Sequence, residues 1–199
     1  MTLRGFEPNN RGSMIRYSLL LLMAILLWAP NVAAQTRGNK IAANIQNIDF
    51  KNFNYGRLCG VRDDSWVPIP NVRLVLRKGH QQYGDESEHV DLRSVKYVDF
   101  DGDGKEEAFV VIDGSTATAA GDVFLAAYVF AYRNGSARQI WSKCNEHSRA
   151  VLRGRSILFT YPEYVGEDAH CCPSYLTTKT YAWKGSTIAL ISKRRKKNN

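Results

Sequence analysis

The chain has 199 residues, of which 44% are hydrophobic and 23% are charged, and its formal net charge is +8. Setting aside the first 34 residues leaves roughly 165, which is enough for one domain with its own hydrophobic core, and no second domain is visible. The excess positive charge is concentrated in the last residues without interleaved aromatics, so sequence-specific nucleic-acid binding is not predicted.

Residues 1–34 have the three-part pattern of a signal peptide. Arg16 supplies a positive charge, residues 19–29 are an apolar run, and small residues end the segment at Ala34. The apolar run is short for a membrane-spanning helix. We therefore expect cleavage between Ala34 and Gln35 and a secreted or periplasmic protein. The polar residues 1–13 leave open whether Met1 or Met14 starts the chain.

Residues 35–47 are expected to form a polar linker, and residues 48–192 to form a β domain. Alternating or β-branched segments predict strands over residues 48–53, 71–77, 90–100, 108–113, 123–132, 137–142, 157–161, 178–183 and 187–192. Asn134-Gly135 is a strong signal for a two-residue hairpin, and Gly185 marks a second hairpin. No convincing amphipathic helix is present.

The predicted fold class is all-β and mainly antiparallel, as a single domain after the cleaved signal peptide. A curved sheet, a sandwich and a partial-propeller-like arrangement all fit these strands. A closed β-propeller needs about four or more blades, and this chain has material for about two.

The most specific chemistry lies between the strands predicted at residues 90–100 and 108–113. Alternate aspartates followed by a glycine suit a tight loop around Ca²⁺, which prefers six to eight oxygen ligands. The ligands of such a site would be four side chains and one main-chain carbonyl: Asp99, Asp101, Asp103, Glu107 and the carbonyl of Lys105.

This loop resembles the calcium loops of FG-GAP and VCBS-type repeats, in which Asp-x-Asp-x-Asp-Gly-x-x-Asp lies between two strands. The resemblance covers about fifteen residues and departs at Glu107, where the family pattern has Asp. The loop is not an EF-hand, because the twelfth position is Val110 instead of a bidentate Glu. A metal-free acidic turn is the alternative, since Asp and Gly are common turn residues.

Four cysteines follow the signal segment: Cys59, Cys144, Cys171 and Cys172. In an exported protein an even number of cysteines predicts disulfides, and four cysteines allow three connectivities. A bond between neighbouring cysteines is geometrically strained. We therefore expect Cys171 and Cys172 to bond separately to Cys59 and Cys144. Redox or metal-binding use of these cysteines is the alternative.

A run of five basic residues lies close to the C-terminus: Lys193, Arg194, Arg195, Lys196 and Lys197. We expect residues 193–199 to be a basic tail. Such a run attracts anionic lipid, acidic polysaccharide or nucleic acid without reading a sequence. A solubilising, frayed end is the alternative interpretation.

Taken as a whole, the chain resembles small uncharacterised secreted bacterial proteins, and more faintly mycobacterial lipoproteins of the LppP/LprE type, from which it differs by lacking a lipidation cysteine. We expect an exported, non-enzymatic domain, stabilised by a cation and by disulfides, that binds an unknown protein or polysaccharide partner. One alternative is a metal-dependent hydrolase that uses the acidic loop or the carboxylates between Glu163 and His170. Another is a secreted inhibitor or chaperone-like protein that binds by strand addition.

Overall fold

The computed structural model describes residues 44–58, 72–115, 123–169 and 171–198. The expected signal peptide, Cys59 and His170 lie outside these residues. Among the described residues, no helix is long and apolar enough to cross a membrane.

Five strands form the central sheet, in the order β3-β4-β5-β6-β7, and every neighbouring pair is antiparallel. Their bounds are β3 (His80–Gln82), β4 (His89–Val98), β5 (Glu107–Ser115), β6 (Val123–Arg133) and β7 (Ser136–Glu146). The turn between β6 and β7 is Asn134-Gly135, and both residues have positive φ, 51° and 79°. The hairpin predicted there is confirmed.

A second, four-stranded antiparallel sheet has the order β11-β10-β9-β8. Its strands are β8 (Arg149–Arg153), β9 (Ser156–Glu163), β10 (Tyr175–Lys184) and β11 (Thr187–Lys197). The hairpin predicted at Gly185 joins β10 to β11. We call the face of this sheet that is turned away from the five-stranded sheet its outer face.

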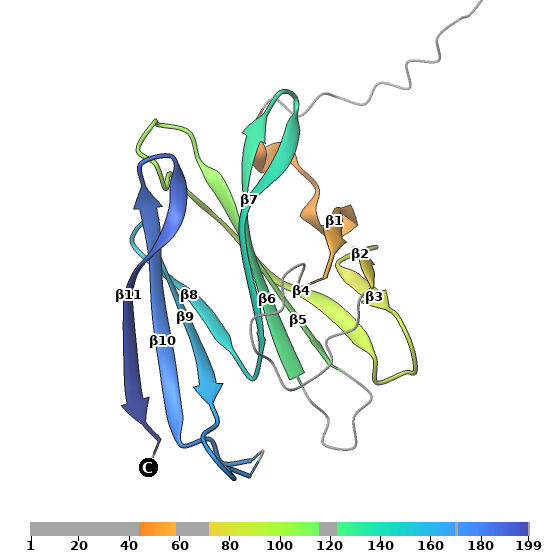
Figure 1. The fold of residues 1–199 in the computed structure, drawn as a ribbon. Coiled ribbons are helices and arrows are strands. Elements are labelled where there is room, and N and C mark those ends of the chain that lie inside the picture. The colour runs from red at the N-terminus through yellow and green to blue at the C-terminus, as the bar shows by residue number, and fades with distance from the viewer. Residues whose placement is uncertain (1–43, 59–71, 116–122, 170, 199) are drawn as a thin grey trace, which may run out of the picture. The chain divides into compact units, whose positions relative to one another are not determined.

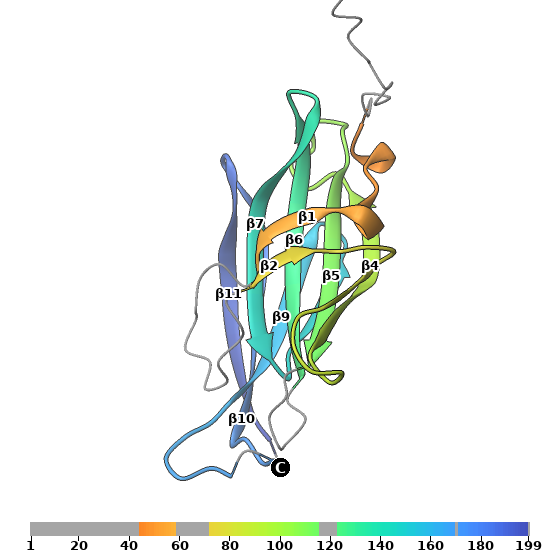
Figure 2. The ribbon, with the colours of Figure 1, turned by 90° about the vertical axis from the view of Figure 1, so that its right-hand side faces the viewer.

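A short antiparallel pair, β1 (Asn54–Arg57) with β2 (Arg73–Val75), forms a third layer. Two 3₁₀ turns precede it, η1 (Ile45–Asn47) and η2 (Phe50–Asn52). In Figure 2 this pair crosses one face of β5, β6 and β7. The five-stranded sheet therefore lies between two layers, with the four-stranded sheet on its other side (Figure 1).

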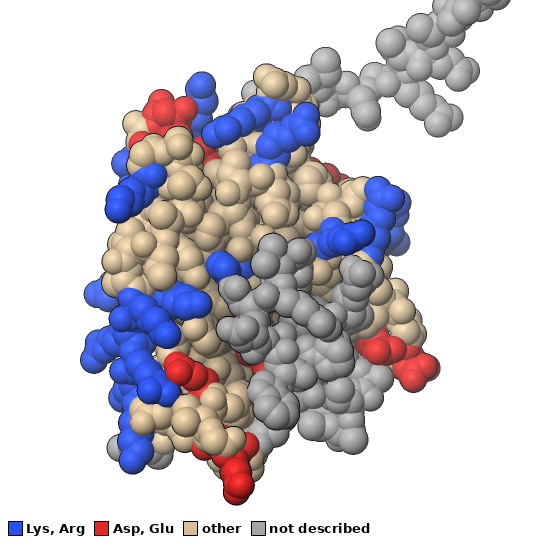
Figure 3. Space-filling model, viewed as in Figure 1, with Lys and Arg blue, Asp and Glu red and all other residues tan. Residues whose placement is uncertain are grey.

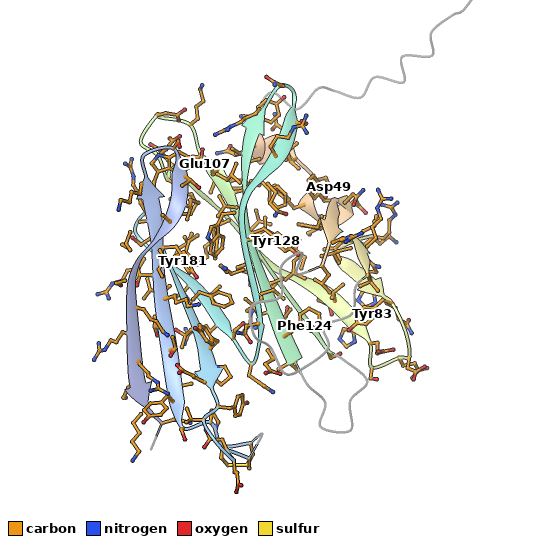
Figure 4. The ribbon with its side chains drawn as sticks, viewed as in Figure 1. Asp49, Tyr83, Glu107, Phe124, Tyr128 and Tyr181 are labelled. Atoms are coloured by element: carbon orange, nitrogen blue, oxygen red, sulfur yellow. A yellow bond between two sulfur atoms is a disulfide. The ribbon has the colours of Figure 1, made fainter. Side chains whose placement is uncertain are left out.

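Strands β5 and β6 supply both hydrophobic cores, because their side chains alternate between the two faces. Val110, Ile112 and Tyr128 pack with the β1-β2 layer. Phe109 and Val129 pack with residues of the four-stranded sheet. Figure 4 shows Tyr128 on the five-stranded sheet and Tyr181 on the four-stranded one. Burial on both faces explains why β5 and β6 are almost continuously apolar.

The predicted all-β, antiparallel fold is confirmed as a sandwich without a closed barrel. Three local predictions are wrong. The strand expected at residues 48–53 is the turn η2, because the Asp49 carboxylate accepts hydrogen bonds from Lys51 N and Asn52 Nδ2 and caps it. Ile45, in the expected linker, is buried in the core.

The third wrong prediction concerns the basic run near the C-terminus. Residues 193–197 are not a tail after the domain but the last part of β11, where they pair with Tyr175 to Lys179 of β10. The charges concealed this strand from the sequence pattern, because β11 is an edge strand and its side chains there are exposed.

Candidate cation site

The acidic loop connects β4 to β5 at one end of the five-stranded sheet, and Figure 4 shows Glu107 at this upper end. Val98, the last residue of β4, pairs with Glu107, the first residue of β5. The strand pairing therefore fixes both ends of the loop. Gly102 and Gly104 have φ of 83° and 84°, a conformation that costs glycine little and other residues more.

Aspartate side chains hold the loop backbone through hydrogen bonds to main-chain N–H groups. Asp99 accepts bonds from Gly102 N at 2.7 Å and from Gly104 N at 3.3 Å. Asp101 Oδ1 accepts from Asp103 N at 3.0 Å, and Asp103 Oδ1 accepts from Lys105 N at 2.7 Å. Each bond is the local Asx type that favours turns, so the sequence determines the loop conformation directly.

Three of the predicted ligands come together. Asp99, Asp101 and Glu107 each offer one carboxylate oxygen, and these oxygens lie within 4.8 Å of one another. Asp103 does not belong to this group, and its carboxylate instead lies 3.9 Å from Lys105 Nζ. The longer side chain of Glu107 thus reaches the group that the resemblance assigns to an Asp at this position.

Glu107 is the buried member of the group, with 6% of its surface exposed. Its Oε2 accepts a hydrogen bond from Phe100 N at 2.9 Å. Burial raises the pKa of Glu107, and the charges of Asp101, Asp103 and Asp99 raise it further, against the opposing effect of that hydrogen bond. A divalent cation would remove this cost by favouring the ionised carboxylate.

Arg155 is the site residue that the sequence pattern did not indicate. It lies in the turn between β8 and β9, and its Nη2 is 3.0 Å from Asp99 Oδ2. The guanidinium therefore already supplies part of the positive charge that the acidic loop needs. No local motif could have predicted this pair, since 56 residues separate its members.

A hollow of about 760 Å³ opens beside the loop. Asp101, Asp103 and Glu107 line it together with Gln46, whose side-chain amide donates a hydrogen bond to Glu106. The hollow gives the carboxylate group a route to solvent. The site can accordingly accept an ion from outside and keep water among the ligands.

The second set of acidic candidates has a structural arrangement. Asp168 accepts hydrogen bonds from Val165 N, Ser174 N and Ser174 Oγ, which lower its pKa and close the connection between β9 and β10. Glu163 accepts a hydrogen bond from the Thr177 hydroxyl and pairs with Arg195 at 3.0 Å; both lower its pKa. These carboxylates satisfy local donors and do not converge on a common point.

The cysteines do not pair as expected. Cys171 and Cys172 are bonded to each other, so the prediction that they reach back separately is wrong. The tight connection held by Asp168 keeps them together at the end of the four-stranded sheet, next to Ser174. Cys144 is disulfide-bonded too.

Comparisons with known proteins add no assignment. No family model matches the chain, and neither the curated proteins nor the solved structures contain a match.

Proposed function

We propose that the protein is an exported, non-enzymatic β domain whose β4–β5 loop binds one Ca²⁺ ion and which binds a partner at the cell envelope or outside the cell. The observation that carries the calcium proposal is the group formed by Asp99, Asp101 and Glu107, with its carboxylate oxygens within 4.8 Å of one another. Hard oxygen ligands at this spacing suit Ca²⁺ better than a softer metal.

The loop backbone supports the same proposal. Asp99 caps Gly102 N and Gly104 N, so the loop is already closed around the carboxylates before an ion arrives. A preformed loop loses little conformational entropy on binding. The role that fits is structural: the ion would join the ends of β4 and β5, and disulfides formed in an oxidising compartment would add to its stabilisation.

A metal-dependent hydrolase is the second candidate, and the hollow of about 760 Å³ beside the loop favours it. A catalytic ion needs an open coordination position for water or substrate. The two candidates differ in one respect: a structural ion changes stability without turnover, whereas a catalytic ion supports hydrolysis.

The test is thermal unfolding of the protein in chelator and in millimolar Ca²⁺. At about a hundred times the dissociation constant, the ion should stabilise the fold by roughly 2.7 kcal/mol, or about 5–10 °C. Asp101→Asn should lose this shift while keeping the hydrogen bond to Asp103 N, since Asn also offers an oxygen. Asp113→Asn, on β5 outside the loop, is the matched control.

No shift in the unaltered protein, or an equal shift in Asp101→Asn, would overturn the calcium proposal. Ca²⁺-dependent hydrolysis that is lost in Asp101→Asn would replace the structural role with the catalytic one.

A further inference from the structure

The two sheets of the sandwich differ sharply in charge. Strands β8 to β11 carry nine Lys and Arg residues and a single carboxylate, Glu163. Strands β3 to β7 carry five Lys and Arg residues and four carboxylates. The positive charge of the domain is therefore concentrated on the four-stranded sheet, and Figure 3 shows much of it gathered over the lower half of β11.

The register of the strands places four of these cations on the outer face. Phe159 points into the core between the sheets, so its neighbour Thr160 points outward. Thr160 pairs with Arg149 on β8 and with Thr178 on β10, which pairs with Arg194 on β11. By the same alternation Arg153 and Lys196 lie on this face.

These four residues, Arg149, Arg153, Arg194 and Lys196, form what we call the cationic face. All four are exposed, and none has an ion-pair partner within the part of the chain that the structure describes.

The cations that point toward the five-stranded sheet are placed differently. Arg195 pairs with Glu163 at 3.0 Å and covers the ring of Tyr175 at 3.6 Å. Lys179 lies over the ring of Tyr161 at 5.1 Å. The single carboxylate of the sheet and these aromatic rings are thus engaged on the inner side, and the outer face keeps its charge uncompensated.

Exposed aliphatic side chains border the cationic face. Leu176 is 37% exposed and lies on the outer face, where it pairs with Lys196. Leu190 and Ile191 are 48% and 53% exposed and lie at the bulge of β11. These are three of the five large hydrophobic residues that are exposed among the described residues.

We propose that the outer face of the four-stranded sheet and the edge of β11 bind the surface of an anionic lipid bilayer. Phosphate headgroups would neutralise the cationic face, and the acyl boundary would take up Leu176, Leu190 and Ile191. This inference rests on the proposed partner-binding role and specifies the partner.

Protection of the sheet edge and binding of a charged polymer each account for less of this surface. Charges on an edge strand prevent unwanted strand pairing, but carboxylates serve that purpose as well as cations, so protection does not explain a face without them. A polysaccharide or a nucleic acid would match the cations but would offer nothing apolar to the aliphatic side chains. Bases and sugars are also commonly bound by aromatic stacking, whereas Tyr161, Tyr175 and Tyr181 point to the inner side.

The test is co-sedimentation with vesicles of phosphatidylcholine alone and of phosphatidylcholine with phosphatidylglycerol, at one fixed Ca²⁺ concentration. The protein should bind only the anionic vesicles. Arg194→Gln/Lys196→Gln should weaken that binding roughly thirtyfold, about fivefold for each cation removed. Lys96→Gln/Arg138→Gln, with the same charge change on exposed residues of the five-stranded sheet, should bind nearly as the unaltered protein does. All proteins share one N-terminus, so any contribution of residues 19–29 is common to them.

Arg149→Gln/Arg153→Gln on the opposite edge strand is a second test of the cationic face, should the first variant fold poorly. Leu176→Ser/Ile191→Ser should weaken vesicle binding several-fold and leave any binding to heparin unchanged. The lipid proposal is overturned if anionic vesicles are not bound, or if both charge variants of β11 and of the five-stranded sheet lose binding equally. Heparin binding together with vesicle binding that is indifferent to Leu176→Ser/Ile191→Ser would also overturn it, in favour of a polysaccharide.

The lipid result and the calcium result can fail separately. Asp101→Asn alters only the loop at the opposite end of the sandwich from the C-terminal part of β11 (Figures 1 and 4). It should lose the calcium-dependent thermal shift and still bind anionic vesicles. Lipid binding without a calcium shift in the unaltered protein would remove the cation proposal alone.

Discussion

Arg155 Nη2 lies 3.0 Å from Asp99 Oδ2, so a turn of the four-stranded sheet supplies a positive charge to the acidic loop of the five-stranded sheet. The side chain of Arg155 is 60% exposed and that of Asp99 22% exposed, so the pair is partly screened by solvent. A bound Ca²⁺ would share the Asp99 carboxylate with this guanidinium. The arginine therefore stabilises the loop without an ion and opposes the ion when it binds.

Arg155→Gln should consequently raise the affinity for Ca²⁺ by a few-fold, on the order of 1 kcal/mol, because the like charge next to the ion is removed. In chelator the same change should lower the free energy of unfolding by at most about 1 kcal/mol, as is usual for an exposed ion pair. Calorimetric titration and chemical denaturation measure the two effects. Weaker Ca²⁺ binding in Arg155→Gln would mean that the arginine mainly positions Asp99.

The raised pKa of Glu107 predicts how stability depends on pH in the absence of Ca²⁺. Because burial places the folded pKa above the unfolded one, Glu107 contributes its full stability below the unfolded pKa of about 4.3 and loses it as the pH rises through the folded pKa. Glu107→Gln should remove this loss, since the amide stays neutral and its oxygen can still accept from Phe100 N.

Chemical denaturation in chelator, over a series of pH values, compares Glu107→Gln with the unaltered protein. The difference should grow in favour of the variant as the pH rises, and saturating Ca²⁺ should reverse its sign. Glu106→Gln, at the neighbouring exposed position, is the control. A constant difference at all pH values would show that Glu107 does not titrate differently in the folded state.

The pairing of residues 193–197 with β10 predicts that this segment is part of the fold. Ending the chain at Ser192 removes five ladder positions and the ion pair between Arg195 and Glu163. At about 0.5–1.5 kcal/mol for each net hydrogen bond, the loss should be about 2–5 kcal/mol. Arg194→Gln/Lys196→Gln retains the backbone ladder and should unfold close to the unaltered protein. Equal stability of the shortened chain would show that the segment behaves as a tail.

Sequence patterns predicted the elements whose signals are local. The hairpin at Asn134-Gly135 follows from turn chemistry, and the runs of β5 and β6 follow from burial on both faces. Strands β1, β3 and β8 were missed, because each has only three to five residues and is too short for a clear alternation. The segment 48–53 misled the prediction, because its apolar residues pack into the core from a capped turn.

The candidate site divides in the same way. The spacing of Asp99, Asp101 and Glu107 predicted a group that the structure brings together. Arg155 and the burial of Glu107 depend on how two distant segments pack, so no local pattern contains them. The charge of β11 was evident from the sequence, but its place on a sheet edge depends on pairing with β10.

Close packing at Gly114 predicts a strongly destabilising substitution in β5. A Cβ atom at this position would lie 2.5 Å from Phe124 Cζ and 2.7 Å from Val90 Cγ1. Gly114→Ala should therefore lower the free energy of unfolding by about 1–3 kcal/mol, as overpacking does. Adding Phe124→Leu should recover part of the loss, which a double-mutant cycle in denaturant measures. Additive losses would place the clash elsewhere.

The central claim is that the loop between β4 and β5 binds one Ca²⁺ ion through Asp99, Asp101 and Glu107. Calorimetric titration of the purified protein with Ca²⁺ tests it most directly. We expect one ion per chain, tighter binding as the pH rises through the raised pKa of Glu107, and no detectable binding in Asp101→Asn. An absence of binding heat in the unaltered protein, or unchanged binding in Asp101→Asn, would contradict it and leave Arg155 as the counter-ion of an acidic turn.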